Sequence, residues 1–233
     1  MGSRVEKHLS RLAMPKTWKI KRKGRKWVTR PLPGPHSLKV GLPLNVLLRD
    51  MLSYAQTAKE VKYVLNNQEI LVDGIRRKEP KFIVGLMDVV SIPSIKKQFR
   101  ILINKKGIII ASEIKQDEIK IKPCKIIGKT AVKTGKLQLN LFDGKNILTE
   151  DKSFNTGDTV VIEVPSHKIK EVLRLEKGAV VYLTKGKHIG ETGIVDEIKG
   201  KKLIYLSGKD KLETLKGYAF VIGKEKPVIE LHE

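Results

Sequence analysis

The sequence predicts an α+β protein of several small domains, in which strands outnumber helices. Two short helical patterns lie within residues 43–95, whereas short β-branched runs separated by Gly- and Asp-containing turns fill the rest of the chain after them. Many short strands at such spacing are typical of small barrels and sandwiches. We therefore divide the chain into a basic arm (1–42), a helix-hairpin module (43–95), a β-rich central domain (96–172) and a C-terminal β-barrel (173–233).

The N-terminal arm carries half of the surplus positive charge. The 233 residues contain 47 Lys and Arg against 25 Asp and Glu, a net charge of +22. Residues 1–40 contain 12 of these basic residues against Glu6 alone, a net charge of +11. A block of one sign is typical of segments that bind nucleic acid. We expect a short amphipathic helix bearing Val5 and Leu9 to end at Pro15, followed by an extended stretch that is ordered mainly by its partner.

Both tryptophans of the chain, Trp18 and Trp27, lie inside this basic arm. A large aromatic ring in such a position either stacks on an exposed base or packs against the neighbouring domain. We favour the packing role for the rings and a nucleic-acid role for the cations around them.

Residues 43–95 show the pattern of two short helices followed by a hairpin. Asn45 is positioned to cap the first helix, and Thr57 opens a capping box at the start of the second. The pair Asp73 and Gly74 is a strong signal for a tight two-residue turn. We expect the two helices to pack face to face and to leave a largely basic outer surface.

Strands are expected wherever β-branched and aromatic residues cluster between turn residues. The candidate strands are residues 70–72, 87–92, 99–103, 108–112, 118–121, 136–142, 159–164, 179–184, 192–198, 203–206 and 218–222. Their number favours small barrels or sandwiches over a parallel sheet with crossover helices.

Catalytic and metal-binding signatures fail when they are tested one by one. The tripeptide Gly128-Lys129-Thr130 matches the end of a phosphate-binding P-loop, but Pro123 stands where that loop needs its first glycine. The chain has no C-x-x-C or H-E-x-x-H spacing, and its single cysteine, Cys124, is interpreted as a small buried apolar residue. We therefore expect no catalytic residue, no metal and no cofactor.

Hydropathy argues against a membrane protein. No run approaches the roughly 18 apolar residues that a membrane-spanning helix needs. The first six residues also lack the apolar core of a signal peptide. We expect a cytoplasmic protein without a membrane partner.

Two segments resemble modules of RNA-associated proteins. Residues 44–92, with the segment 69–74 at the hairpin, resemble the S4 RNA-binding domain. Residues 175–195, in which Gly186 and Gly190 suit tight turns, resemble the KOW motif, a hairpin of small SH3-like barrels. The resemblance therefore implies an S4-like module and an SH3-like KOW barrel in an α+β, multidomain chain.

The order of the parts resembles, from end to end, the S4e family of archaeal and eukaryotic small-subunit ribosomal proteins. The segments that carry the resemblance are 8–16, 57–61, 72–74, 85–89 and 217–223. The resemblance implies a non-catalytic constituent of the small ribosomal subunit, which binds ribosomal RNA and contacts neighbouring ribosomal proteins. It also implies a location in that subunit in the cytoplasm, and we expect no homo-oligomer.

The candidate RNA-binding residues are basic side chains of the arm, of the outer face of the module and of the glycine-containing hairpin. They are Lys16, Lys19, Lys21, Arg22, Lys23, Arg25, Lys26, Arg30, Arg49, Lys59, Lys62, Arg76, Arg77, Lys185 and Lys187.

Two other classes of function remain open at this point. One is an RNA-modifying enzyme of the pseudouridine-synthase type, which needs a catalytic acid in a cleft. Asp143, Asp158 and Asp196 lie beside glycine or turn positions, so we interpret them as turn formers instead. The other is a KOW-bearing transcription or translation factor that binds its partner transiently.

Overall fold

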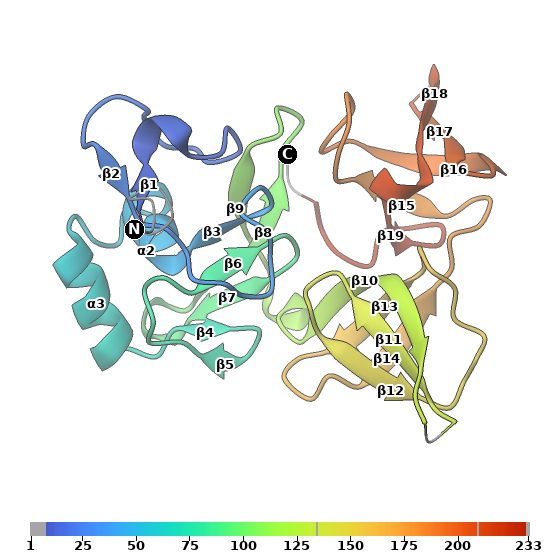
Figure 1. Cartoon of the computed structure of the whole chain (residues 1–233), viewed down its shortest axis with the longest axis horizontal. Helices are drawn as coiled ribbons and strands as arrows, with labels where there is room; N and C mark the ends of the chain where they lie inside the picture. The colour runs from blue at the N-terminus through green and yellow to red at the C-terminus, as the bar shows by residue number, and fades with distance from the viewer. Residues whose placement is uncertain (1–7, 134, 209, 232–233) are drawn as a thin grey trace, which may run out of the picture. The chain divides into compact units, whose positions relative to one another are not determined.

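The structure is a computed structural model that describes three stretches of the chain, residues 8–133, 135–208 and 210–231 (Figure 1). Two compact units are present: the chain up to Leu102 with Ile108–Gln116, and Ile103–Gly107 with the chain from Asp117 onward. Strands far outnumber helical turns. The expected β-rich α+β class is therefore confirmed.

The first unit contains three sheets (Figure 1). β1 (Leu9–Ser10) pairs with β2 (Trp27–Val28), and β3 (Gly41–Pro43) pairs with β6 (Ile83–Gly85), both antiparallel. The third sheet has five strands in the order β5-β4-β7-β8-β9. Their bounds are Leu71–Val72 for β4, Ile75–Arg76 for β5, Val89–Ile92 for β7, Lys97–Ile103 for β8 and Ile109–Glu113 for β9.

The predicted hairpin turn between β4 and β5 is confirmed. Asp73 and Gly74 both have positive φ, 48° and 69°, the combination that a type I′ turn requires. The Asp73 carboxylate also accepts a hydrogen bond from Val89 N at 3.1 Å. This contact fixes the turn to β7, which pairs with β4.

Two short helical segments pack together as predicted. α2 (Leu44–Val46) continues directly into the π-helix η2 (Leu47–Met51), and α3 (Ala58–Asn67) packs against both (Figure 1). Val61 and Leu65 of α3 are completely buried. They lie four residues apart, so one face of α3 supplies the apolar contact.

Of the two predicted helix caps, one is confirmed and one is wrong. The capping box of α3 is confirmed, because the Thr57 hydroxyl accepts a hydrogen bond from Glu60 N at 3.2 Å. The predicted cap of the first helix is wrong, since Pro43 occupies the capping position. Asn45 lies inside α2, and its side-chain amide donates to Thr29 Oγ1 at 2.6 Å. Asn45 therefore ties the helix to the end of the arm.

The predicted N-terminal helix is wrong over the described residues. β1 is followed by a 3-10 helix, η1 (Arg11–Ala13), and Arg11 N donates to Lys26 O at 2.9 Å. Strand pairing with the later part of the arm satisfies these backbone groups, so it overrides the helical spacing of the apolar residues. The part of the predicted helix before residue 8 lies outside the described residues.

A buried hydrogen bond joins the end of the arm to the core of the first unit. His36 Nε2 lies 2.9 Å from Asp88 Oδ2, and both side chains are almost fully buried. Gly85 N donates to the same carboxylate at 2.9 Å. A Cβ at position 85 would collide with the His36 ring. Glycine is therefore required there for the imidazole to approach the strand.

The second unit contains two antiparallel five-stranded sheets, in the orders β12-β11-β10-β13-β14 and β18-β17-β16-β15-β19 (Figure 1). The first sheet is formed by β10 (Ile121–Ala131), β11 (Leu137–Leu141), β12 (Asn146–Thr149), β13 (Thr159–Glu163) and β14 (Ile169–Leu173). The second is formed by β15 (Val180–Leu183), β16 (Thr192–Lys199), β17 (Lys202–Ser207), β18 (Asp210–Leu215) and β19 (Ala219–Gly223). The remaining 3-10 helices are η3 (Pro93–Ile95), η4 (Gln116–Glu118) and η5 (Lys216–Tyr218).

The strand expected at residues 118–121 is wrong. That stretch holds the end of η4 and a turn, and β10 begins only at Ile121. β10 itself was not predicted, because Lys122 and Pro123 interrupt its apolar pattern. β1, β2, β3 and β6 of the first unit were also missed, and so were three further strands of this unit, β12, β14 and β18. All three lie at sheet edges, where a strand buries little apolar surface and leaves a weak sequence signal.

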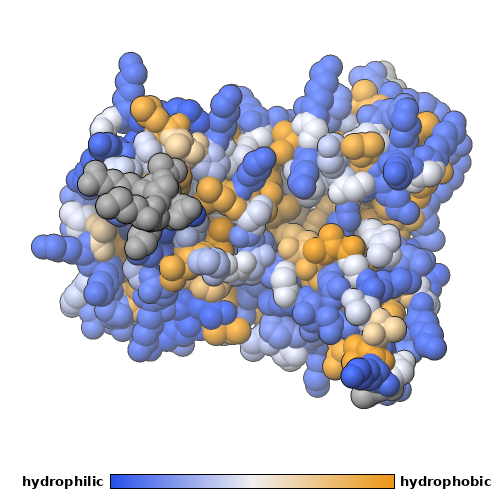
Figure 2. Space-filling view, viewed as in Figure 1, coloured by the Kyte–Doolittle hydropathy of each residue, from blue (hydrophilic) through white to orange (hydrophobic). Residues whose placement is uncertain are grey.

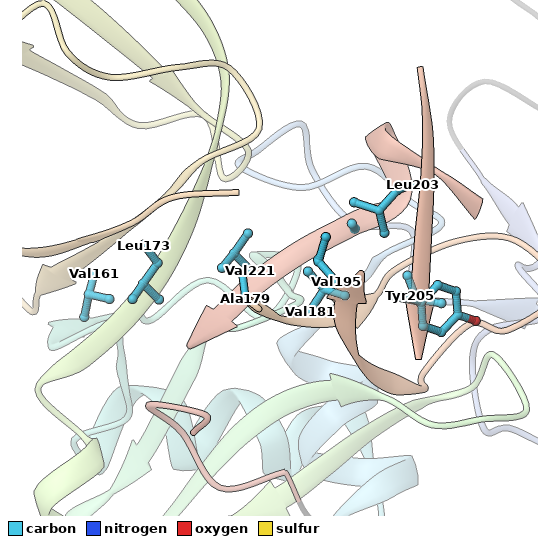
Figure 3. Close-up of a cluster of buried hydrophobic side chains, with 10 residues drawn as sticks. Val161, Leu173, Ala179, Val181, Val195, Leu203, Tyr205 and Val221 are labelled. Carbon is cyan, nitrogen blue, oxygen red and sulfur yellow. The ribbon is translucent and has the colours of Figure 1, made fainter. Parts of the chain in front are cut away.

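One apolar core is shared by strands of both sheets in the second unit. Val161 of β13 and Leu173 of β14 belong to the same cluster as Val181, Val195 and Tyr205 of the second sheet (Figure 3). A separate cluster around Cys124 fills the other side of the first sheet. The predicted division near residue 173 thus falls between strands that share a core, and it stays a prediction.

A buried ion pair lies beneath the first sheet of this unit. Lys122 Nζ is 3.0 Å from Asp143 Oδ2, and each side chain is about 1% exposed. Lys145 Nζ approaches the same oxygen at 3.4 Å. Burial by itself raises the pKa of Asp143, but attraction to Lys122 and Lys145, with their hydrogen bonds, holds that pKa below its ordinary value. Cys124 is buried beside the pair, as predicted.

Removing one member of this pair should destabilise the second unit strongly. We expect Lys122→Met to lower the free energy of unfolding by about 3–5 kcal/mol, because it removes the buried partner of the Asp143 carboxylate and leaves the more exposed Lys145 beside it. The double change Lys122→Met with Asp143→Asn should recover much of the loss. Denaturant unfolding of the three proteins measures this coupling, with Lys136→Met, from the exposed Lys136–Glu150 pair, as the control. Equal losses in the single and double variants would contradict the pairing.

Candidate nucleic-acid interface

The basic arm folds back on itself and exposes its cations. The β1–β2 pair closes a loop over residues 11–26, and Arg11 Nη1 donates to Lys21 O at 2.7 Å across it. Hydrophilic side chains cover most of the surface in view (Figure 2). All eight predicted RNA-binding residues of the arm are exposed: Lys16, Lys19, Lys21, Arg22, Lys23, Arg25, Lys26 and Arg30.

Trp18 anchors the arm to the first unit. Its ring is 3% exposed, and its Nε1 donates to Gly41 O at 2.9 Å. Next to it, Thr17 O accepts a hydrogen bond from Ile109 N at 2.7 Å. The packing role is therefore confirmed for Trp18. The expectation that the arm is ordered mainly by its partner is wrong for this stretch, because a buried ring and backbone hydrogen bonds hold it to its own unit.

Trp27 has a different environment. It is 49% exposed, and Lys26 Nζ lies 5.1 Å from its ring centroid, within the range of a cation–π contact. The His8 ring lies 5.3 Å away. The exposed part of the indole remains open to stacking, the second role weighed for it from the sequence.

A polar pocket lies between the arm and the π-helix. It has a volume of about 260 Å³ and is lined by Arg11, Arg25, Arg49, Asp50 and Gln56. Arg49 Nη2 donates to Asp50 Oδ2 at 2.7 Å. A π-turn inserts an extra residue into a helix and is frequent at functional sites. Here η2 carries both of these neighbouring residues.

Arg11 was missed by sequence reasoning. It is 8% exposed, although it lies within the stretch for which the sequence predicted an amphipathic helix ending at Pro15. The signal that could have found it is the strand pairing of β1 with β2, which no short-range pattern reveals. Arg25 and Arg49 were predicted as RNA-binding residues, and the structure brings them together in one pocket.

The basic residues of the helical module fall into two groups. Lys59 and Lys62 are exposed on α3 beside Tyr63, which is 69% exposed and was not predicted. Arg76 and Arg77 instead have structural contacts. Arg76 Nη2 donates to Asn66 O at 2.9 Å, and the Arg77 guanidinium lies 4.3 Å from the centroid of the Phe82 ring.

Lys185 and Lys187 are exposed on the loop between β15 and β16. Gly190 in this loop has a φ of +80°, and a Cβ there would collide with the Asn104 backbone. His188 Nδ1 lies 3.2 Å from Glu191 Oε2, so that histidine has an internal partner. The loop is therefore held rigidly while its two lysines point outward.

A second group of cations lies near this loop. Lys125 Nζ donates to Gly217 O at 2.9 Å. Burial, and then repulsion from Lys185 and Lys216, lower the pKa of Lys125 to about 8. Repulsion of this kind means that positive charges converge, which is the electrostatic condition for binding a polyanion.

The acids considered for the enzyme alternative have structural roles. Asp143 belongs to the buried pair with Lys122, and Asp158 accepts hydrogen bonds from Asn155 N and Leu175 N, as a turn former does. Asp196 does not form a turn; it lies inside β16 and pairs with Lys211 at 2.7 Å.

Searches for other kinds of site give no candidate in the described parts of the chain. Among residues 8–133, 135–208 and 210–231, no group of three or more His, Cys, Asp or Glu side chains could hold a metal ion. Within the same stretches, no helix has the length and apolarity needed to cross a membrane.

Known proteins are similar to this chain over most or nearly all of its length. The profile of the RS4NT (NUC023) domain matches residues 1–39, and that of the ribosomal family S4e matches residues 95–169. The small ribosomal subunit protein eS4 of Methanosphaera stadtmanae is 44% identical over 237 residues, which cover 99% of this chain and 97% of that protein. The chain belongs to the ribosomal S4e family.

Further S4e relatives extend the likeness to structure. The small ribosomal subunit protein eS4 of Archaeoglobus fulgidus is 43% identical over 97% of this chain and 99% of its own length. The crystal structure of the 30S ribosomal protein S4e from Thermoplasma acidophilum has a TM-score of 0.70 and 29% identity, covering 79% of this chain and 95% of that one. The family resemblance drawn from the order of the motifs is confirmed.

Loss of the buried tryptophan should release the arm of this S4e chain. We expect Trp18→Ala to lower the free energy of unfolding of the first unit by about 3–5 kcal/mol, as for other buried aromatic residues. Limited trypsin digestion should then cut within residues 16–30 faster. Trp27→Ala, which removes a half-exposed ring, is the matched control. Equal protection of the arm in both variants would contradict the anchor.

Lys125 should make stability depend on alkaline pH. Between its folded pKa of about 8 and the ordinary value of 10.5, the unfolded state binds more protons than the folded state, so the free energy of unfolding rises with pH. The contribution cannot exceed about 1.4 kcal/mol per pH unit, the value for one proton. Lys125→Arg, which does not titrate there, should abolish it. Denaturant unfolding from pH 7 to 10.5 measures the difference, and parallel curves for the two proteins would refute it.

Proposed function

We propose that this chain is a structural constituent of the small ribosomal subunit that binds ribosomal RNA through its basic arm and its helical module. The observation that carries the proposal is the 44% identity, over nearly the full length of both chains, to a protein named as belonging to that subunit. The net charge of +22 supports a polyanionic partner. The chain then acts in translation, in cytoplasmic ribosomes, beside neighbouring ribosomal proteins.

The exposed cations of the arm provide the main RNA contact. A folded RNA has irregular grooves lined by phosphates, and a loop held at its base by a β-pair and a buried tryptophan can enter such a groove. Because the loop is already closed, less conformational entropy is lost on binding. Positioning comes from phosphate contacts, and placement on one RNA comes from the shape of the site.

The finer organisation is part of the same proposal. Residues 43–95 act as an S4-like RNA-binding module, supported by the packing of α3 on η2 and by the turn at Asp73. Residues 96–172 form the central domain. Residues 173–233 act as an SH3-like KOW barrel, supported by the antiparallel order of its five strands and by the rigid loop at Gly190.

The remaining predicted RNA-binding residues differ in how much of each side chain is free to contact RNA. Lys59 and Lys62 with the exposed ring of Tyr63 combine phosphate contacts with a stacking surface. Lys185 and Lys187 provide a second basic surface in the other unit. Arg76 and Arg77 contribute less, because part of each guanidinium is already bound to the protein.

Membership of the S4e family separates this proposal from the enzyme alternative, because S4e proteins are structural ribosomal components and not enzymes. The transient-factor alternative differs in stoichiometry. A constituent stays with the small subunit when particles are washed at moderate salt, whereas a factor dissociates.

Neutralising part of the arm should weaken RNA binding in a salt-dependent way. We expect the triple change of Lys19, Lys21 and Lys23 to Gln to reduce the magnitude of the slope of log affinity against log salt by about 2–3, since each phosphate contact contributes about 0.7–0.9. Filter binding to small-subunit ribosomal RNA between 50 and 300 mM salt measures the slope. In sucrose gradients of cell extract, the variant should shift from small subunits to the free fraction.

The control removes the same charge elsewhere. Lys133, Lys152 and Lys168 are exposed and lie outside the predicted contacts, so their change to Gln should alter the slope much less. Absence of the unaltered chain from small subunits would refute the proposal. Equal slopes for both triple variants would refute the role of the arm.

A further inference from the structure

The pocket between the arm and the π-helix has an unusual charge arrangement. Three guanidinium groups and one carboxylate line it. Asp50 pairs with Arg49 at 2.7 Å, so the charges of Arg11 and Arg25 remain. The pocket is therefore positive overall, and its one acid is already engaged.

Arg11 indicates that a ligand belongs there. Its side chain is more than nine-tenths buried, and its Nε has no hydrogen-bond partner among the described residues. Its Nη1 bonds only a backbone carbonyl, Lys21 O. No ion pair to Arg11 is found within residues 8–133, 135–208 and 210–231. Burying a cation without an anionic partner is costly, so an anion entering the pocket would be bound strongly.

The chemistry of the lining selects the class of anion. Guanidinium forks match the tetrahedral oxygens of phosphate and donate two parallel hydrogen bonds. The volume of about 260 Å³ is close to nine times the roughly 30 Å³ that one water molecule takes in the liquid. A phosphate fills only part of that space. Gln56 and Asp50 complete the lining. Arg49 binds Oδ2 of Asp50, so Oδ1 of Asp50 and the side-chain amide of Gln56 are the groups that can pair with a base edge.

We propose that this pocket binds one nucleotide from an unpaired stretch of RNA, with its phosphate on Arg11 and Arg25 and its base edge against Gln56 and Asp50. The inference rests on the proposed RNA-binding function and assigns it a site. Arg11 and Arg25 belong to the arm, and Arg49 and Asp50 belong to the π-helix. The bound nucleotide thus joins the two and supplies the missing partner of Arg11.

Arginine side-chain NMR tests the site directly on the full chain. Each of the four ribonucleoside 5′-monophosphates, and separately inorganic phosphate, is titrated at constant ionic strength while the Nε–H signals of arginine are followed. We expect at least one mononucleotide to shift the signals of Arg11 and Arg25 saturably. Inorganic phosphate should shift them at a concentration at least several-fold higher, because it lacks the base.

Variants separate the pocket from general charge. Arg25→Gln should weaken mononucleotide binding about tenfold, whereas Lys39→Gln, which removes one exposed charge outside the pocket, should change it less than twofold. Gln56→Ala should weaken the mononucleotide and leave inorganic phosphate unaffected. Because Gln56 and Arg25 are exposed, these changes should leave the fold intact, and thermal unfolding checks this.

Three results would overturn the inference. They are no saturable shift with any mononucleotide, equal affinity for phosphate and the best mononucleotide, and equal losses in Arg25→Gln and Lys39→Gln. Binding of ribosomal RNA by the unaltered chain is measured in parallel. If the RNA still binds while mononucleotides do not, the pocket assignment fails and the proposed function stands; if neither binds, both fail.

Discussion

Mutual repulsion among its cations is the constraint on which the rest of this protein depends. A net charge of +22 opposes compaction, and the arm concentrates that charge. The chain meets this constraint with contacts that do not involve charge: the buried indole of Trp18, the β1–β2 pair and the Asn45 amide on Thr29. The charged side chains are left outside, where solvent and counterions screen them.

Backbone geometry at a few positions shapes the surface that carries the basic side chains. The positive φ angles at Asp73 and Gly74 turn the hairpin, and Gly85 admits the His36 ring. The π-helix brings Arg49 and Asp50 to the arm. These features lie within the chain itself, so the basic surface is organised without a partner and would lose less conformational entropy on binding a ligand than a disordered tail loses.

Much of the fold followed from short-range patterns, and the failures have a common cause. The capping box at Thr57, the turn at Asp73 and the central strands other than β10 were predicted because their signals lie within a few residues. The edge strands β12, β14 and β18 were not, since their exposed faces carry polar residues. The positive charge of the arm was evident from the sequence. The pocket was not, because Arg11 and Arg49 are brought together only by the tertiary structure.

The buried Lys122–Asp143 pair has a consequence for heat tolerance. Hydration of an ammonium or a carboxylate becomes less favourable as water warms, so the penalty for enclosing these groups shrinks with temperature. Contacts between hydrocarbon side chains do not gain in the same way. At high temperature the enclosed pair therefore opposes folding less than it does at low temperature. The five-stranded sheet that contains β10 then loses less stability on heating than it would if hydrocarbon side chains replaced the pair.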